Sequence, residues 1–295
     1  MKKLCLTTFS VFLLFCLLKS KAQSQEGTPE NITINGNGAS LKGRFYIGEG
    51  TGSLPTLLLL QGFPGNQTDV IGLGKILSQS AINIMTFNFS GTHQSEGECS
   101  FENSQLDIKA ALEFLYFPEN IVRYKIDTSL IIIGGYSYGG GMGMTYAIRN
   151  PKIKYVITIA GNDWGAFFEE YLRNKELKNT TDANIDRTIV SGIARFEKGG
   201  TPREIAEAGI ENLDSAYFLR KSAHRLSNRN ILIICGLDDD NAYDFILPFY
   251  RALKKVNAQH VQITAFQDDH SFLKNRFELA ATIIKWIKAI SENQK

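Results

Sequence analysis

Short, mostly apolar runs alternate with amphipathic stretches along most of this chain, and that alternation is its strongest structural signal. The apolar runs predict buried strands at 55–60, 82–89, 130–134, 154–160, 231–235 and 261–266. The stretches between them predict helices at 70–80, 104–117, 140–149, 242–255 and 271–290. Ser104 and Asp107 have the spacing of a capping box at the start of one of these helices. Because strands that are apolar throughout are covered on both faces, the pattern predicts an α/β fold: a mostly parallel central sheet with helices on both sides.

The alternation changes at two places. Residues 32–47 alternate around an Asn-Gly-Asn-Gly sequence, which predicts a hairpin that adds an antiparallel edge to the sheet. Between 161 and 228 the chain is rich in charged and aromatic residues and has no clear core strand. We therefore expect a core formed by 23–161 and 229–295, interrupted by a helical cap at 162–228. This cap would cover the C-terminal edge of the sheet, where ligands bind in open α/β sheets.

The first 22 residues have the pattern of a secretion signal. Two lysines follow Met1, an apolar run covers 4–18, and Ser20-Lys21-Ala22 suits cleavage before Gln23. The apolar run is short for a membrane-spanning helix, which needs ~20 residues. We therefore predict a signal peptide at 1–22 and a secreted or periplasmic protein. The alternative is an uncleaved N-terminal segment, which would then be the chain's only contact with a membrane.

Composition and charge exclude two classes of protein. Hydrophobic residues make up 43% of the 295 residues and charged residues 21%, so the chain is not mainly disordered. Four lysines lie in the predicted signal, and the remainder has 28 basic against 30 acidic residues, a net charge of −2. This balance does not favour a nucleic-acid partner. Cys99 and Cys235 remain after the signal, which is too few for a disulfide scaffold and leaves only a single bridge open.

A G-x-S-x-G pentapeptide, Gly135-Tyr136-Ser137-Tyr138-Gly139, carries the strongest chemical signal. It follows a predicted strand directly and precedes a predicted helix, which is the context of a nucleophilic serine on a sharp turn. The helix N-terminus behind the serine favours developing negative charge. No dinucleotide or P-loop register fits the same glycines, so the motif does not indicate phosphate binding. Ser137 is thus a candidate nucleophile.

A serine nucleophile needs a base, and the base needs a carboxylate. Among four histidines, His270 follows the last predicted strand, which places it at the same sheet edge as Ser137. The candidate acids are Asp238, Asp239 and Asp240, because this run follows the strand at 231–235 and therefore lies at the same edge of the sheet. Asp163, just after the strand at 154–160, is a further candidate. Their positions in the sequence alone do not decide which of these aspartates is the acid.

Taken together, these motifs resemble the α/β-hydrolase superfamily over about residues 30–290. Gln61-Gly62-Phe63-Pro64-Gly65 is similar to the family's His-Gly-x-Pro-Gly oxyanion turn, with Gln61 where a histidine is usual. Gly236-x-x-Asp239 matches the family's Gly-x-x-Asp acid, so the resemblance ranks Asp239 first and leaves Asp238 and Asp163 as alternatives. His270 matches the family's histidine, and the order serine, aspartate, histidine is the family's order. The segment 162–228 resembles the family's cap.

The resemblance implies acyl transfer through a Ser137–His270–Asp239 triad, with the backbone N–H groups of Phe63 and Tyr138 as the oxyanion hole. No metal or cofactor is expected, since nothing has zinc-ligand spacing. The expected partner is a small ester or a short peptide. Phe167 and Phe168 in the cap are candidate substrate contacts, although they could simply pack the cap onto the sheet. We expect hydrolysis of carboxylic esters, with peptidase or amidase activity as the alternative and a secreted non-catalytic binding module as the more distant one.

Overall fold

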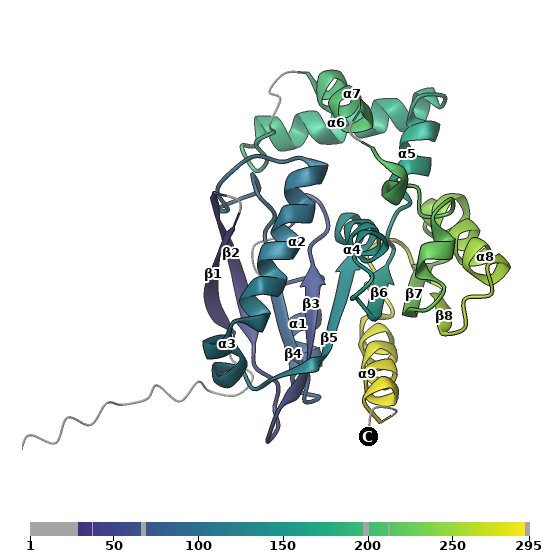
Figure 1. Ribbon diagram of the computed structural model, residues 1–295. Coiled ribbons are helices and arrows are strands. Elements are labelled where there is room, and N and C mark those ends of the chain that lie inside the picture. Colours follow the sequence, from purple (N-terminus) through teal and green to yellow (C-terminus); the bar gives the residue numbers. More distant parts are fainter. Residues whose placement is uncertain (1–28, 37, 66–68, 197–200, 212, 293–295) are drawn as a thin grey trace, which may run out of the picture.

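In the computed structural model, described for residues 29–292 except 37, 66–68, 197–200 and 212, the strands form one sheet of eight (Figure 1). The predicted signal peptide lies outside the described residues. The strands are β1 (Glu30–Gly36), β2 (Ala39–Tyr46), β3 (Leu54–Leu60), β4 (Asn83–Phe87), β5 (Ile126–Tyr136), β6 (Tyr155–Ile159), β7 (Asn230–Gly236) and β8 (Val261–Phe266). Their order is β1-β2-β4-β3-β5-β6-β7-β8. The β1–β2 and β2–β4 pairs are antiparallel and the other pairs are parallel, so the fold class predicted from the sequence is confirmed.

The helices cover both faces of this sheet and one of its ends (Figure 1). They are α1 (Leu73–Ser78), α2 (Phe101–Tyr116), α3 (Pro118–Arg123), α4 (Tyr138–Arg149), α5 (Trp164–Tyr171), α6 (Lys175–Val190), α7 (Pro202–Glu211), α8 (Leu247–Lys255) and α9 (Arg276–Glu292). A π-helical turn, Ala242–Ile246, leads directly into α8. No helix among the described residues is both long and apolar enough to cross a membrane.

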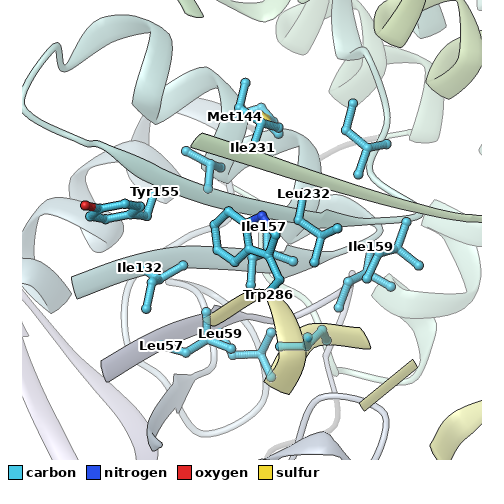
Figure 2. Close-up of a cluster of buried hydrophobic side chains, with 14 of the residues drawn as sticks. Leu57, Leu59, Ile132, Met144, Tyr155, Ile157, Ile159, Ile231, Leu232 and Trp286 are labelled. Atoms are coloured by element: carbon cyan, nitrogen blue, oxygen red, sulfur yellow. The ribbon is translucent and has the colours of Figure 1, made fainter. Parts of the chain in front are cut away.

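Alternate residues of β3 point to opposite faces of the sheet and enter two separate cores. Leu57 and Leu59 belong to a cluster that includes α1, α8 and α9, where Trp286 of α9 lies close to them (Figure 2). Leu58 and Leu60 belong to a second cluster with α2. All four leucines have no exposed surface. This two-sided burial is the reason why the strand reads as continuously apolar rather than alternating.

The helix α2 begins earlier than the capping-box pattern predicts. Its N-cap is Ser100, whose hydroxyl accepts a hydrogen bond from the Asn103 N–H at 3.1 Å. The predicted capping residues Ser104 and Asp107 lie inside the helix and are buried. The Asp107 carboxylate instead accepts hydrogen bonds from the N–H and hydroxyl of Ser90, at 2.7 and 2.6 Å. The capping-box pattern places the start of α2 too late, because Ser104 and Asp107 form hydrogen bonds to other parts of the fold, to Tyr138 and Ser90, instead of capping the helix.

The structure also corrects the start of the terminal helix and decides the question of a disulfide bridge, which the sequence left open. The terminal helix starts at Arg276 instead of 271, because Phe272 has a φ of +52° and the side chain of Asp268 accepts a hydrogen bond from the Asn275 N–H at 2.8 Å. A bridge between Cys99 and Cys235 is not formed, and both thiols are free. Burial raises the pKa of Cys99 to about 12 and that of Cys235 to about 11, so neither is a thiolate at neutral pH.

The segment between β6 and β7 holds α5, α6 and α7, which lie beyond the end of the sheet toward which β3 and β5 run (Figure 1). Backbone hydrogen bonds attach this segment to the loop after β4. The N–H of His93 donates to the Ile193 carbonyl at 2.8 Å, and the N–H of Arg195 donates to the Gly91 carbonyl at 2.8 Å. The helices α5, α6 and α7 therefore lie over the carboxyl ends of the strands. They are attached there through the chain connections to β6 and β7 and also through these hydrogen bonds to the loop after β4.

Candidate active site

Ser137 occupies a strained turn between β5 and α4, as the G-x-S-x-G motif predicts. Its φ is +51°, in the left-handed region that residues with a side chain seldom adopt. A Cβ on Gly135 would lie 2.3 Å from the backbone carbon of Gly139, and one on Gly139 would lie 2.5 Å from the Gln61 carbonyl oxygen. Only glycine fits at either position. The motif thus lets α4 pack directly against the end of β3 and leaves the serine half-buried at the edge of the sheet.

Three side chains from three strand ends form one hydrogen-bonded chain at this edge. His270 Nε2 lies 2.9 Å from Ser137 Oγ, and His270 Nδ1 lies 2.6 Å from Asp239 Oδ2. Asp239 is buried, with 7% of its surface exposed, whereas His270 is half-buried. A buried carboxylate on Nδ1 fixes the imidazole so that Nε2 can accept the serine proton. This is the geometry that a serine nucleophile with a general base requires.

The loops after β7 and β8 are held against each other, which places Asp239 beside His270. The Asp238 N–H donates to the Asp268 carbonyl at 3.0 Å. A Cβ on Gly236 would lie 2.4 Å from the same carbonyl oxygen, so the close approach of the two loops requires glycine there. The glycine of the Gly-x-x-Asp pattern therefore has a local physical reason.

Neither alternative acid contacts His270. Asp238 accepts a hydrogen bond from the Gln267 side chain and lies 3.7 Å from Lys274 Nζ, at the surface. Asp163 is buried with 1% exposure and serves as the N-cap of α5, accepting from the Ala166 N–H at 3.2 Å. Asp239, and neither Asp238 nor Asp163, is therefore the carboxylate that lies at Nδ1 of His270.

The Asp163 carboxylate joins the two ends of the segment between β6 and β7. Besides capping α5, it accepts hydrogen bonds from the backbone N–H groups of Leu219 at 3.1 Å and Arg220 at 2.9 Å. The Arg220 guanidinium adds an ion pair at 3.2 Å. Burial raises the pKa of Asp163, while these donors act against that rise. We call this arrangement the Asp163 clasp.

The turn after β3 lies next to the serine. A Cβ on Gly62 would lie 3.5 Å from Ser137 Cβ, and the side chain of the buried Gln61 donates to Thr86 Oγ1 at 2.9 Å. Both predicted oxyanion residues therefore lie next to Ser137 along the chain or beside it: Phe63 follows Gly62, and Tyr138 is the first residue of α4. A first-turn N–H has no partner within its own helix, so that of Tyr138 is a suitable donor to an oxyanion. A pocket of about 120 Å³ opens here, lined by Gln61, Gly62, Phe63, Gly65, Ile71 and Tyr136.

A continuous series of ring contacts leads from this turn into α5. The Phe63 ring lies 5.7 Å from that of Tyr138, which lies 5.3 Å from Trp164. Trp164 in turn lies 5.4 Å from Phe167 and 6.4 Å from Phe168. The sequence pattern indicates the two phenylalanines but not Trp164, which directly follows the Asp163 cap and opens α5.

The two predicted substrate contacts differ in their surroundings. Phe168 is only 7% exposed and packs against the rings of Phe101, Trp164 and Tyr171. Phe167 is half-buried, and besides the rings of Trp164 and Phe168, both 5.4 Å away, it lies 5.8 Å from that of Phe245 in the π-helical turn. Phe168 therefore has the environment of a packing residue, whereas Phe167 retains surface for a ligand.

Metal ligands do not gather in the described part of the chain, where no group of three or more histidine, cysteine, aspartate or glutamate side chains is placed to hold an ion.

Comparison with known proteins agrees with this architecture. Residues 55–183 match the family model of the α/β-hydrolase fold. The chain is similar to a hypothetical protein of Pseudomonas aeruginosa, at 16% identity and a TM-score of 0.67 over 96% of this chain and 99% of that one. No curated protein matches the chain.

Two further solved structures are similar. One is an esterase of the archaeon Pyrobaculum calidifontis, at 19% identity and a TM-score of 0.62 over 90% of this chain and 86% of that one. The other is dipeptidyl peptidase 4 of Porphyromonas gingivalis, at 20% identity and a TM-score of 0.60 over 90% of this chain and 36% of that chain. The resemblance to the α/β-hydrolase superfamily is thus confirmed at the level of the fold.

The Asp163 clasp generates a stability prediction. Asp163→Asn should lower the free energy of unfolding by about 2–4 kcal/mol, because an amide cannot accept all of the buried N–H donors and loses the charge facing Arg220. Urea denaturation measures the change. Asp238→Asn is the matched control, and it should shift stability by less than about 0.5 kcal/mol because its carboxylate is at the surface. Equal effects of the two substitutions would show that the clasp contributes nothing particular.

Proposed function

Because this chain has the α/β-hydrolase fold, we propose that it is a serine hydrolase that acts on carboxylic esters through Ser137, His270 and Asp239. The observation that carries the proposal is the hydrogen-bonded chain from Ser137 Oγ through His270 to the buried Asp239. Such a chain activates a hydroxyl that is otherwise a poor nucleophile. Hydrolysis also agrees with the fold's occurrence in an esterase and a peptidase among the similar structures.

The proposed reaction has two halves. Ser137 Oγ attacks the ester carbonyl while His270 Nε2 takes its proton, and Asp239 stabilises the resulting imidazolium. The tetrahedral intermediate collapses to an acyl-enzyme when His270 returns the proton to the leaving alcohol. Water then attacks the acyl-enzyme with His270 again as base, which releases the acid and restores Ser137.

The N–H groups of Phe63 and Tyr138 are the proposed oxyanion hole. They come from the turn after β3 and from the first turn of α4, which meet at Ser137. The N-terminal end of α4 adds a favourable dipole for the negative charge on the carbonyl oxygen. Each donor of this kind is worth roughly 10²–10³ in rate.

Peptide or amide hydrolysis is the second candidate, favoured by the likeness to a dipeptidyl peptidase. Esters rank first because the ring series from Phe63 to Phe167 offers apolar surface for an acyl or aromatic group. A purely binding role is disfavoured, because a binding module has no need of the hydrogen-bonded serine, histidine and aspartate. A panel of acyl esters, amides and short peptides, assayed with the purified protein, separates the three.

Removing the nucleophile tests the proposal directly. Ser137→Ala should abolish ester turnover while the melting temperature changes little, because the hydroxyl is half-buried on a turn and contributes little to the core. Spectrophotometric ester hydrolysis and thermal melting measure the two effects. Turnover that survives in Ser137→Ala would place the chemistry elsewhere. Asp239→Asn should lower kcat by roughly 10⁴-fold, while its neighbour Asp238→Asn should retain turnover.

The difference between Phe167 and Phe168 predicts a division of roles. Phe167→Ala should change the preferred acyl length, chiefly through KM, by about 10–200-fold in discrimination. Phe168→Ala should instead destabilise the protein by about 3–5 kcal/mol, because its ring fills a buried site among other rings. Kinetics on a homologous ester series and urea denaturation give the two readouts. If Phe167→Ala leaves the ranking of the esters unchanged, that ring is a packing residue.

We also propose that the mature chain begins near Gln23 and is exported, on the basis of the lysines, apolar run and small residues at 1–22. Mass spectrometry of the secreted or periplasmic fraction should find an N-terminus within a few residues of Gln23. A full-length product in the cytoplasm would contradict export, and a full-length product in the membrane would favour an uncleaved anchor.

A further inference from the structure

We propose that Tyr136, the residue before the nucleophile, is a positioning residue that sets the place of His270 and of the oxyanion turn relative to Ser137. This inference rests on the proposed function and deepens it. It concerns a side chain that makes no hydrogen bond to Ser137, His270 Nε2 or Asp239 and therefore acts through its neighbours.

The first contact is with the loop that carries the histidine. The Tyr136 hydroxyl donates a hydrogen bond to the backbone carbonyl of His270 at 3.1 Å. The two rings also lie 5.2 Å apart, tilted by 44°. Because Tyr136 is bonded directly to Ser137 in the chain, this hydrogen bond links the backbone of the base to the backbone of the nucleophile.

The order of the strands explains why such a link is needed. Ser137 follows β5 and His270 follows β8, and β6 and β7 lie between these strands in the sheet. No ladder of backbone hydrogen bonds therefore joins the two strand ends. Among the described residues, the hydrogen bonds between the serine turn and the β8 loop are those from Tyr136 to the His270 carbonyl and between Ser137 and the imidazole.

The second contact is with the oxyanion turn. A Cβ on Gly62 would lie 3.0 and 3.1 Å from two atoms of the Tyr136 ring, so this ring lies directly against the backbone of the turn. Phe63, the proposed oxyanion donor, is the next residue. One side chain thus touches the segment that carries the base and the segment that carries an oxyanion N–H, and it is itself next to the nucleophile.

The hydroxyl is suited to a permanent donor role. Burial, with a smaller effect of the nearby Asp239 carboxylate, raises the pKa of Tyr136 to about 12. The phenol therefore keeps its proton at neutral pH, and it remains a hydrogen-bond donor to the carbonyl there.

The test measures how fast Ser137 reacts with a fluorophosphonate. This reagent labels only activated serines, and the natural substrate need not be known. Tyr136→Phe removes only the hydroxyl and should slow the labelling of Ser137, followed by mass spectrometry, by about threefold to tenfold. On any ester that the wild type hydrolyses, kcat should fall by a similar factor while KM stays unchanged. The matched control is Tyr124→Phe, which also removes a hydroxyl with one acceptor, Glu30 at 3.4 Å, and should label at the wild-type rate.

Each outcome decides the question. An unchanged labelling rate in Tyr136→Phe, an equal loss in Tyr124→Phe, or a rise in KM alone overturns the positioning role and leaves the proposed function intact. Unfolding of Tyr136→Phe, detected by circular dichroism, also overturns it, because the hydroxyl would then serve the fold. Wild-type protein that the fluorophosphonate does not label overturns the proposed function and this inference together.

Discussion

The close approach of α4 to the end of β3 is the constraint on which the site depends. It is possible only because Gly139 has no side chain, and the bare Gly135 lets the start of α4 lie equally close to β5. Ser137, between these two glycines, occupies a positive-φ turn at the edge of the sheet. The same approach brings the turn after β3 against the serine and leaves the first N–H of α4 beside it. The position of Ser137 and of the proposed oxyanion donors thus follows from the packing of α4, whereas Asp239 and His270 come from strands further along the sheet.

The sheet and the gathering of Ser137, His270 and Asp239 at one edge could be predicted from sequence, because both depend on local signals. Apolar runs mark buried strands, and the carboxyl ends of parallel strands meet at one edge. The acid could be narrowed to one position only through the resemblance to a family. Asp238, Asp239 and Asp240 are neighbours in the chain, and a linear pattern does not distinguish them. The packing of the loops after β7 and β8 determines that Asp239 is the one that faces the imidazole of His270.

What the sequence could not supply are contacts between distant segments. Ser104 and Asp107 looked like a helix cap because capping residues and buried hydrogen-bonding residues have the same chemistry, and only the loop after β4 shows which role applies. Asp163 looked like a candidate acid for the same reason, since its partners at Leu219 and Arg220 are more than fifty residues away in the chain. The place of Trp164 and Phe101 near the site likewise depends on ring contacts between distant segments, which a linear pattern does not contain.

The Asp163 clasp has a consequence for how such a protein can diversify. The segment between β6 and β7 leaves the sheet and returns to it at a single carboxylate, so its two ends are fixed side by side whatever lies between them. Lengthening a loop whose ends are already joined costs only about 0.6 kcal/mol for each doubling of its length. Changes in the length of the chain between these joined ends are therefore tolerated at little cost in loop entropy, and they leave the strands that hold Ser137, Asp239 and His270 as they are.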